Sequence, residues 1–177
     1  MRNQILFFCL VLFFSSCETN VNNNVIPGTT QAYVPVYADL SQQSSVSLEA
    51  AQPTTHAGKI YAYGNYIFQN DENKGIHIID NSNPSQPHKI AFIRIPYSTE
   101  VAVKGSYLYT NSINDLIVLD LSNPQSPSVV KKMKNVFPLI NQEYPPFTNV
   151  YFQCADASKG IVIDWQLQQV TNPTCRR

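Results

Sequence analysis

The sequence predicts an all-β protein built from propeller-type repeats, and three observations support this. The segment GIHIIDNSNPSQP (75–87) returns as DLIVLDLSNPQSP (115–127), 40 residues further along the chain. Ten tyrosines and nine phenylalanines stand against two methionines and six glycines, a composition typical of β-proteins. Short apolar runs also alternate with turn residues. A period near 40 with several strands per unit is the signature of a propeller blade.

Each full unit divides into four runs rich in β-branched and aromatic residues, which we expect to be strands. In the first unit the runs are 59–63, 66–69, 76–80 and 89–95, and in the second they are 101–104, 107–110, 116–121 and 128–134. GIHII and DLIVL are apolar at consecutive positions, as expected for strands packed between neighbouring blades. An open meander or a sandwich is the alternative.

The same turn residues follow the third strand of each unit. They are Asp80, Asn83, Pro84 and Pro87, which recur as Asp120, Asn123, Pro124 and Pro127. An aspartate at a strand end can accept hydrogen bonds from N–H groups two residues on, and Asn-Pro favours turn or extended geometry. The second proline of each set lacks an N–H and fits at the start of the next strand or at a sheet edge. We therefore assign these residues a structural turn role, and with them Asp164, rather than a catalytic one.

A third copy is incomplete. Residues 150–165 (VYFQCADASKGIVIDW) resemble 66–80 (YIFQNDENKGIHIID), although chance similarity between β-rich segments would also explain it. We predict a β-repeat domain over 33–177, with two full blades and a partial third. The units are 58–96, 100–137 and 148–170. Stacked repeats normally need at least three units to shield one another, so a closed propeller is not expected in this single chain.

These motifs resemble the LVIVD repeat, which is named for an apolar strand that ends in aspartate. The resemblance runs from Gly58 to Trp165, and the shared Asp-x-Ser-Asn-Pro-x-x-Pro spacing carries it. It implies propeller blades in a secreted or lipid-anchored bacterial protein whose biochemical role is largely unassigned. The order of VPVYADL, GKIYAYGNYIF and the cysteine segment is also similar to that of Bacteroidetes lipoproteins with these repeats. Members of that group often carry more blades.

Residues 1–16 are predicted to be a lipoprotein signal peptide. Arg2 is followed by an apolar run, Ile5 to Phe14, that is too short for a membrane span of about 20 residues. The run ends in FSSC, which resembles a lipobox with phenylalanine at its first position, and this implies diacylation of Cys17. An ordinary cleaved signal with an incidental cysteine is the alternative. Glu18 after the cysteine favours the outer membrane by resemblance and leaves the facing undecided.

Two polar stretches flank the first apolar run of the mature chain. Residues 17–32 are asparagine-rich and poor in large apolar groups, so we expect a lipidated N-terminus and flexible tether. Tyr33 to Leu40 is expected to add a strand to the sheet. Gln42 to Thr55 is polar again.

The four cysteines divide by position. Cys9 lies within the signal peptide and Cys17 is the lipidation candidate, which leaves Cys154 and Cys175. In an oxidising compartment such a pair favours a disulfide over a reactive or metal-binding thiol. It would close a loop of about 20 residues and stabilise the fold by about 3 kcal/mol.

No catalytic constellation, metal site or cofactor site is recognised. His56, His77 and His88 lack ligand spacing, and His77 alternates with isoleucines as a packed strand residue would. Asp71-Glu72-Asn73 offers too few oxygens for calcium. The net charge of zero gives no field to attract nucleic acid.

Two surface features remain as candidates for contact with a partner. Lys131, Lys132 and Lys134 are expected to protect an exposed edge strand, with contact to an anionic lipid or glycan as the alternative. The insertion PLINQEYPPFTN (138–149) carries Tyr144 and Phe147 as a candidate aromatic platform for a glycan or peptide, or else covers an open blade edge.

From these features we expect a non-catalytic binding or scaffold module, held at the membrane by its N-terminal lipid. Its partner is a protein or a glycan, and oligomerisation could supply the missing blades. The alternatives are an accessory or catalytic component of envelope polysaccharide metabolism, and a truncated remnant of a longer propeller protein.

Overall fold

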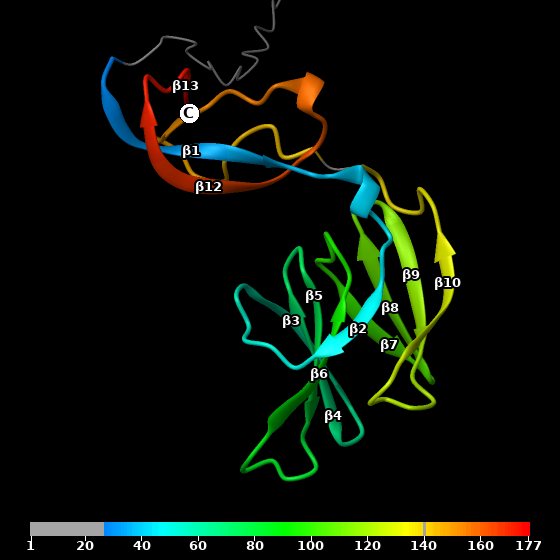
Figure 1. Ribbon diagram of the computed structural model, residues 1–177. Coiled ribbons are helices and arrows are strands. Elements are labelled where there is room, and N and C mark those ends of the chain that lie inside the picture. The colour runs from blue at the N-terminus through cyan, green and yellow to red at the C-terminus, as the bar shows by residue number, and fades with distance from the viewer. Residues whose placement is uncertain (1–26, 140) are drawn as a thin grey trace, which may run out of the picture.

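The computed structural model describes residues 27–139 and 141–177, which form thirteen β-strands and two short 3-10 helices (Figure 1). The strands build three open sheets, which confirms the predicted all-β class. The predicted signal peptide, Cys9 and Cys17 lie outside the described residues. Within the described residues, none of the helices has the length and apolar character needed to cross a membrane.

The first repeat forms an antiparallel sheet of five strands in the order β2-β6-β5-β4-β3. Its strands are β2 (Ser47–Ala50), β3 (Ala57–Tyr63), β4 (Tyr66–Asp71), β5 (Gly75–Asp80) and β6 (His88–Arg94). We call this sheet blade 1. The four predicted strands are present, and the fifth, β2, comes from the stretch that the sequence marked only as polar. It pairs with β6 and therefore covers the outer edge of the blade.

The second repeat forms an antiparallel sheet of four strands in the order β10-β9-β8-β7, which we call blade 2. Its strands are β7 (Val101–Lys104), β8 (Tyr107–Ser112), β9 (Asp115–Asp120) and β10 (Ser128–Met133). The lysine-bearing strand β10 lies at its outer edge, where Lys131, Lys132 and Lys134 are all exposed. Lys132 reaches across to donate a hydrogen bond to the Ser44 carbonyl.

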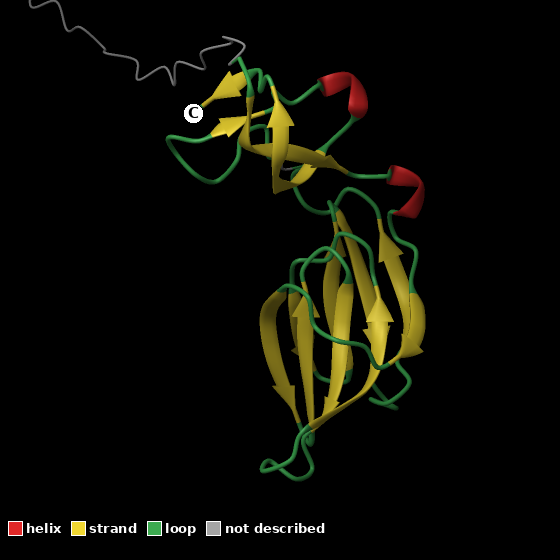
Figure 2. Ribbon diagram, turned by 60° about the vertical axis from the view of Figure 1, so that its left-hand side comes forward, coloured by secondary structure: helices red, strands yellow, loops and turns green. Residues whose placement is uncertain are grey.

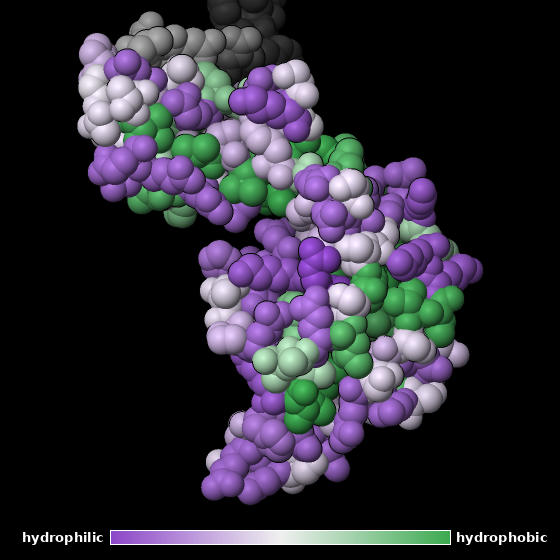
Figure 3. All heavy atoms as spheres, in the orientation of Figure 1, coloured by the Kyte–Doolittle hydropathy of each residue, from purple (hydrophilic) through white to green (hydrophobic). Residues whose placement is uncertain are grey.

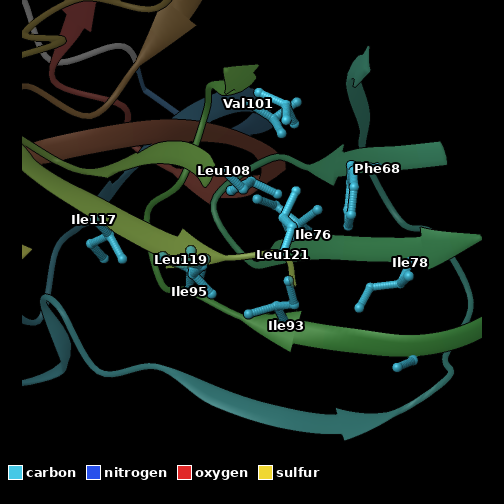
Figure 4. Close-up of a cluster of buried hydrophobic side chains, with 12 residues drawn as sticks. Phe68, Ile76, Ile78, Ile93, Ile95, Val101, Leu108, Ile117, Leu119 and Leu121 are labelled. Carbon is cyan, nitrogen blue, oxygen red and sulfur yellow. The ribbon is translucent and has the colours of Figure 1, made fainter. Parts of the chain in front are cut away.

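The two blades pack face to face, and their main hydrophobic core lies between them (Figures 2 and 4). Burial of each large aliphatic side chain contributes about 1.5–3 kcal/mol. The buried members of this cluster are Phe68, Ile76, Ile78, Ala91, Ile93 and Ile95 from blade 1 and the segment after it, with Val101, Val103, Leu108, Ile117, Leu119 and Leu121 from blade 2. A hydrogen bond from the Tyr61 hydroxyl to the Val103 carbonyl (2.8 Å) ties the inner strands together. The apolar runs of the two repeats are therefore the two halves of one core.

The third sheet combines the N-terminal strand with the C-terminal segment, in the order β12-β1-β11-β13. Its elements are β1 (Thr29–Tyr37), β11 (Tyr151–Phe152), the 3-10 helix η2 (Ala157–Lys159), β12 (Val162–Thr171) and β13 (Cys175–Arg176). A smaller core of Phe152, Val162, Trp165 and Cys175 lies on it. The helix η1 (Leu40–Gln42) joins β1 to blade 1. The third sheet lies at one end of the molecule, beyond the two blades (Figure 1).

This third sheet differs from a partial blade in its pairing. In blade 1, β4 and β5 are hairpin neighbours. Their counterparts β11 and β12 are separated by β1, which runs parallel to β11 and antiparallel to β12. The strand begins at Thr29, so the last part of the predicted tether, which extended to residue 32, belongs to the sheet. Ala32 of this N-terminal strand is fully buried, and Tyr33 and Tyr37 pack against the small core of the third sheet.

Candidate functional site

The repeated turn residues make local hydrogen bonds at the blade edges. The Asp80 carboxylate accepts from the Ser82 N–H (2.8 Å), and the Asp120 carboxylate accepts from the Ser122 N–H (2.7 Å). Hydrogen bonds from Ser82 and Ser122 lower the pKa of both aspartates below the usual range. Both carboxylates are thus committed to their own turns.

The asparagine and prolines of the repeat shape the rest of each turn. Asn83 accepts from the Ser85 N–H, and its carbonyl accepts from the Gln86 N–H across a turn that holds Pro84. Asn123 does the same with Gln125 and Ser126 around Pro124. Pro87 and Pro127 directly precede β6 and β10. None of these residues lines a cavity that we describe below.

A buried polar group on blade 1 was not foreseen from the sequence. The Asp71 carboxylate accepts hydrogen bonds from the N–H groups of Thr55 (2.9 Å) and His56 (2.7 Å), and from the Thr55 hydroxyl. The His77 Nε2 lies 3.2 Å from the same carboxylate. These contacts hold the segment 51–56 across the face of blade 1 that points away from blade 2. The only sequence signal was a difference between the repeats: the positions of Asp71 and His77 are occupied by Ser112 and Ile117 in the second repeat.

Burial and hydrogen bonding set the ionisation of this pair. Burial raises the pKa of Asp71, but the hydrogen bonds from His56, Thr55 and His77 outweigh it and lower the pKa to about 2. Burial lowers the pKa of His77, and the hydrogen bond to Asp71 offsets this only in part. An ionised carboxylate can only accept, so the His77 Nε2 carries the proton and its buried Nδ1 has no hydrogen-bond partner.

The Asp71–His77 pair cannot act on a substrate. The side chain of His77 is 0% exposed and that of Asp71 is 2% exposed, and Phe92 packs on the imidazole with ring centroids 4.8 Å apart. As expected for His77, the histidine is a packed strand residue. The pair holds a covering segment in place.

The insertion 138–149 packs on the third sheet. The Asn141 side chain accepts from the Val162 N–H (3.0 Å), and the Trp165 indole donates to the Gln142 carbonyl (2.8 Å). These bonds attach the insertion to β12. The insertion therefore covers the small core around Phe152 and Trp165.

The two candidate platform residues lie in different surroundings. Phe147 is 51% exposed and stacks on Tyr33 of β1, with ring centroids 5.2 Å apart. Tyr144 is 42% exposed, contacts the buried Phe152 edge-on at 6.3 Å, and has the Arg177 guanidinium 5.7 Å above its ring. The structure does not bring these two rings into one platform. Phe147 covers β1, whereas Tyr144 packs against Phe152 and Arg177 with part of its ring exposed.

Tyr144 lines a cavity of about 350 Å³ on the third sheet. The polar side chains at its wall come from the insertion and from the segment before β12, and the disulfide lies beside it. The lining residues are Asn141, Glu143, Tyr144, Phe152, Cys154, Ala155, Asp156, Ala157, Gly160, Val162 and Cys175. Hydrogen bonds from Ser158 to Oδ1 lower the pKa of Asp156, and its second oxygen, Oδ2, lies 4.0 Å from the Lys159 Nζ.

Cys154 and Cys175 form a disulfide in the structure, with Cα atoms 5.3 Å apart. The bond links Cys154, two residues after β11, to Cys175 in β13, and β11 and β13 are also paired as neighbouring strands. The carbonyl of Pro145 accepts a hydrogen bond from Arg177, two residues beyond the disulfide. The disulfide therefore cross-links two of the chain segments that line the cavity around Tyr144. In the part of the chain that the structure describes, no cluster of three or more histidine, cysteine or acidic side chains is placed to hold a metal ion.

The family model of the LVIVD repeat matches residues 55–91 and 97–134. The two matches correspond to blade 1 and blade 2, and they confirm that these units resemble the LVIVD repeat. Neither the curated proteins nor the solved structures include a match to this chain. The fold and the comparison together define an all-β protein with two propeller-type repeats and a third sheet of separate construction.

Proposed function

We propose that this protein is a lipid-anchored module of the bacterial cell envelope that binds a glycan without catalysis, through the cavity around Tyr144. Anchoring rests on the signal segment and on Cys17, and the outer membrane is the proposed site. The binding role rests on one observation, the partly exposed Tyr144 ring, packed edge-on against Phe152, beside amide and carboxylate side chains in a cavity of about 350 Å³.

The chemistry of that cavity suits a sugar. An aromatic ring offers an apolar face on which the C–H face of a pyranose can stack, and carboxylate and amide groups accept or donate hydrogen bonds to hydroxyls. Tyr144 supplies the ring, and Asn141, Glu143 and Asp156 supply the polar groups. Because hydrogen bonds from Val162 and Ser158 already hold Asn141 and Asp156, little free energy would be lost in ordering these two side chains on binding.

Binding to an array of bacterial envelope glycans, followed by calorimetry with the glycans that bind, tests this proposal. Tyr144→Ala should weaken binding at least tenfold, or about 1.4 kcal/mol, with little change in melting temperature, whereas Tyr144→Phe keeps the ring and most of the affinity. Phe147→Ala is the matched control and should lower the melting temperature through the lost Tyr33 contact while binding persists. The proposal would be overturned if the protein bound none of the glycans on the array, or if Tyr144→Ala bound them with unchanged affinity.

Anchoring is tested separately by metabolic labelling with an alkynyl fatty acid. The wild-type protein should be labelled and fractionate with membranes, and Cys17→Ala should lose both properties. An unlabelled wild type would instead support an ordinary cleaved signal, and a labelled Cys17→Ala protein would place the lipid on another residue.

Glycan hydrolysis is the second candidate function, because Glu143 and Asp156 line the same cavity. Glycosidases use two carboxyl groups, one of which must stay protonated to act as the acid. The pKa of Asp156 is lowered, so Asp156 would be the ionised member of such a pair, and Glu143 is the other carboxyl group at this cavity. Release of reducing ends from a bound glycan, lost in Glu143→Gln, would favour this candidate over simple binding.

A further inference from the structure

A second cavity, of about 310 Å³, lies at the junction of both blades with the insertion and β12. Its walls come from the β4–β5 and β8–β9 turns, the connection between the blades, the insertion and β12. They are formed by Asn73, Tyr97, Thr99, Glu100, Asn111, Ile113, Phe137, Pro138, Gln142 and Ile163. The volume is near the lower end of the range for ligand pockets, so it suits a ligand of one or two residues.

One wall of this cavity is a strained turn. Three hairpins in the blades have two-residue loops, Gly64-Asn65, Gly105-Ser106 and Ile113-Asn114. In each, the first loop residue has a positive φ, at 56°, 61° and 54° respectively. Glycine is the favoured residue at such a position, and a β-branched side chain there is an outlier. The chain thus uses glycine in two equivalent turns and isoleucine in the turn that lines the cavity.

Core packing does not account for Ile113. The residue is partly exposed and belongs to neither of the two buried clusters that the described residues form. Tyr97, which lines the same cavity at φ 64°, has a structural reason, because its hydroxyl bonds both the N–H and the carbonyl of Asp39. The Ile113 backbone is held by a hydrogen bond from its N–H to the Tyr97 carbonyl and one from the Asn111 amide to its own carbonyl. These bonds would hold a glycine equally well, so they do not account for the isoleucine side chain. Strained residues cluster at ligand sites.

The polar groups of the cavity indicate the class of ligand. No hydrogen bond of the Asn73 or Gln142 side-chain amides occurs among the described residues, although their backbones are bonded. An amide offers one donor and one acceptor side, which matches the N–H and C=O of a peptide group. Ile113, Phe137 and Pro138 form an apolar wall beside them.

Charge at the edge of the cavity comes from Glu100. This carboxylate is more than half exposed and pairs with Lys59 on the surface. A ligand with a basic group could compete for it, whereas an acidic ligand would be repelled. We propose that this cavity binds a short peptide segment in which an apolar side chain enters between Ile113 and Phe137 and a basic residue follows it. The proposal is independent of the glycan site.

The test compares two blocked dipeptides, N-acetyl-leucyl-lysine amide and N-acetyl-leucyl-glutamic acid α-amide, whose side-chain carboxylate is free. Their binding to the whole mature protein is measured by NMR shift perturbation and calorimetry. The wild type should bind the lysine compound more tightly, and Glu100→Gln should bring the two affinities together. Tyr144→Ala should leave both unchanged, which separates this site from the glycan site. Absence of saturable binding of both compounds at millimolar concentration overturns the proposal.

The matched variants act on the turn itself. Ile113→Gly removes strain and creates a Gly-Asn loop, so the melting temperature should rise by a few degrees while binding of the lysine compound weakens at least tenfold. Gly105→Ala places a side chain at φ 61° with open space around it, so it should lower the melting temperature and leave binding unchanged. A stabilised Ile113→Gly protein with wild-type affinity would show that the isoleucine has no role in binding.

Discussion

Equivalent faces of the two blades have different surroundings: in blade 1 this face packs against blade 2, and in blade 2 it faces away from blade 1. The face of blade 1 that packs against blade 2 carries Tyr61, Tyr63, Phe68, Ala91 and Ile93, and the equivalent positions in blade 2 hold Ala102, Lys104, Tyr109, Lys131 and Met133. The second set faces away from blade 1. Lys104 and Lys131 are exposed there, and none of the other sheets in the described residues covers them. A repeat at the end of a stack is normally distinguished by such a polar outer face.

The opposite outer face belongs to blade 1 and is closed in another way. The segment 51–56 crosses it, held by Asp71, and Lys89 donates hydrogen bonds to the Gln52 carbonyl and the Thr54 hydroxyl. Of the apolar residues on this face, Ile60 remains 63% exposed. In the view of Figure 3, apolar surface residues are interspersed with hydrophilic ones. We infer that polar side chains make the outer face of blade 2 compatible with solvent, and that the segment 51–56 partly covers the outer face of blade 1.

The largest expected effect comes from removing the anchor of that covering segment. Asp71→Ala leaves the N–H groups of Thr55 and His56 without their acceptor and His77 without its carboxylate partner, and should reduce the free energy of unfolding by about 3 kcal/mol. In blade 2, the neutral side chain of Asn111 accepts from the Thr99 and Glu100 N–H groups in a similar place. Asn111→Ala should therefore cost about 1.5 kcal/mol. Chemical denaturation measures both, and equal losses would contradict the special role of the charged anchor.

The next effect concerns association. Replacing the two lysines on the outer face of blade 2 by their blade 1 counterparts, Lys104→Tyr with Lys131→Ala, should expose an apolar sheet face and make the protein self-associate. The wild type should remain a monomer in sedimentation velocity over the same concentrations. A defined wild-type oligomer that these substitutions leave intact would instead support completion of the blades across chains.

A smaller effect is the loss of stability in acid. The folded pKa of Asp71 is about 2, below the usual value near 4, so its contribution is present above about pH 4 and is lost as the pH falls toward 2. The expected loss is about 2 kcal/mol. Denaturation midpoints measured from pH 5 to pH 2 should show this slope in the wild type, and Asp71→Asn should flatten it. An unchanged slope in Asp71→Asn would place the acid sensitivity elsewhere.

The smallest effect is expected at His77, whose counterpart in blade 2 is Ile117. Because the folded pKa of His77 is lowered, stability should decline as the pH falls below the usual histidine value near 6.5. His77→Ile removes a buried nitrogen without a partner, so stability at pH 7 should change by less than about 1 kcal/mol and the decline between pH 7 and pH 5 should disappear. A large loss at pH 7 would show that the hydrogen bond to Asp71 matters more than we infer.

Sequence reasoning succeeded where a signal was local and repeated. The eight predicted strands of the two blades lie within two residues of their predicted ends, because Gly64, Gly105 and the Asp-x-Ser-Asn-Pro segments mark turns directly, whereas β2 was not predicted. The candidate site was harder to foresee. Tyr144 and Phe147 were grouped because they are close in sequence. In the structure, Phe147 stacks on Tyr33 of β1, whereas Tyr144 contacts Phe152 of β11, so the two rings have different surroundings.

By itself, the amino-acid sequence determined the all-β class, the two repeats and the turn role of their aspartates and prolines. Each of these depends on interactions between residues a few positions apart. Only the tertiary structure decided how the outer faces of the two blades are covered and that β1 lies between β11 and β12. It also decided that Ile113, at a cavity wall, has a positive φ of the kind that glycine usually adopts. Those outcomes depend on contacts between segments far apart in the chain, such as Thr55 with Asp71 or Tyr33 with Phe152, and local periodicity carries no information about such pairs.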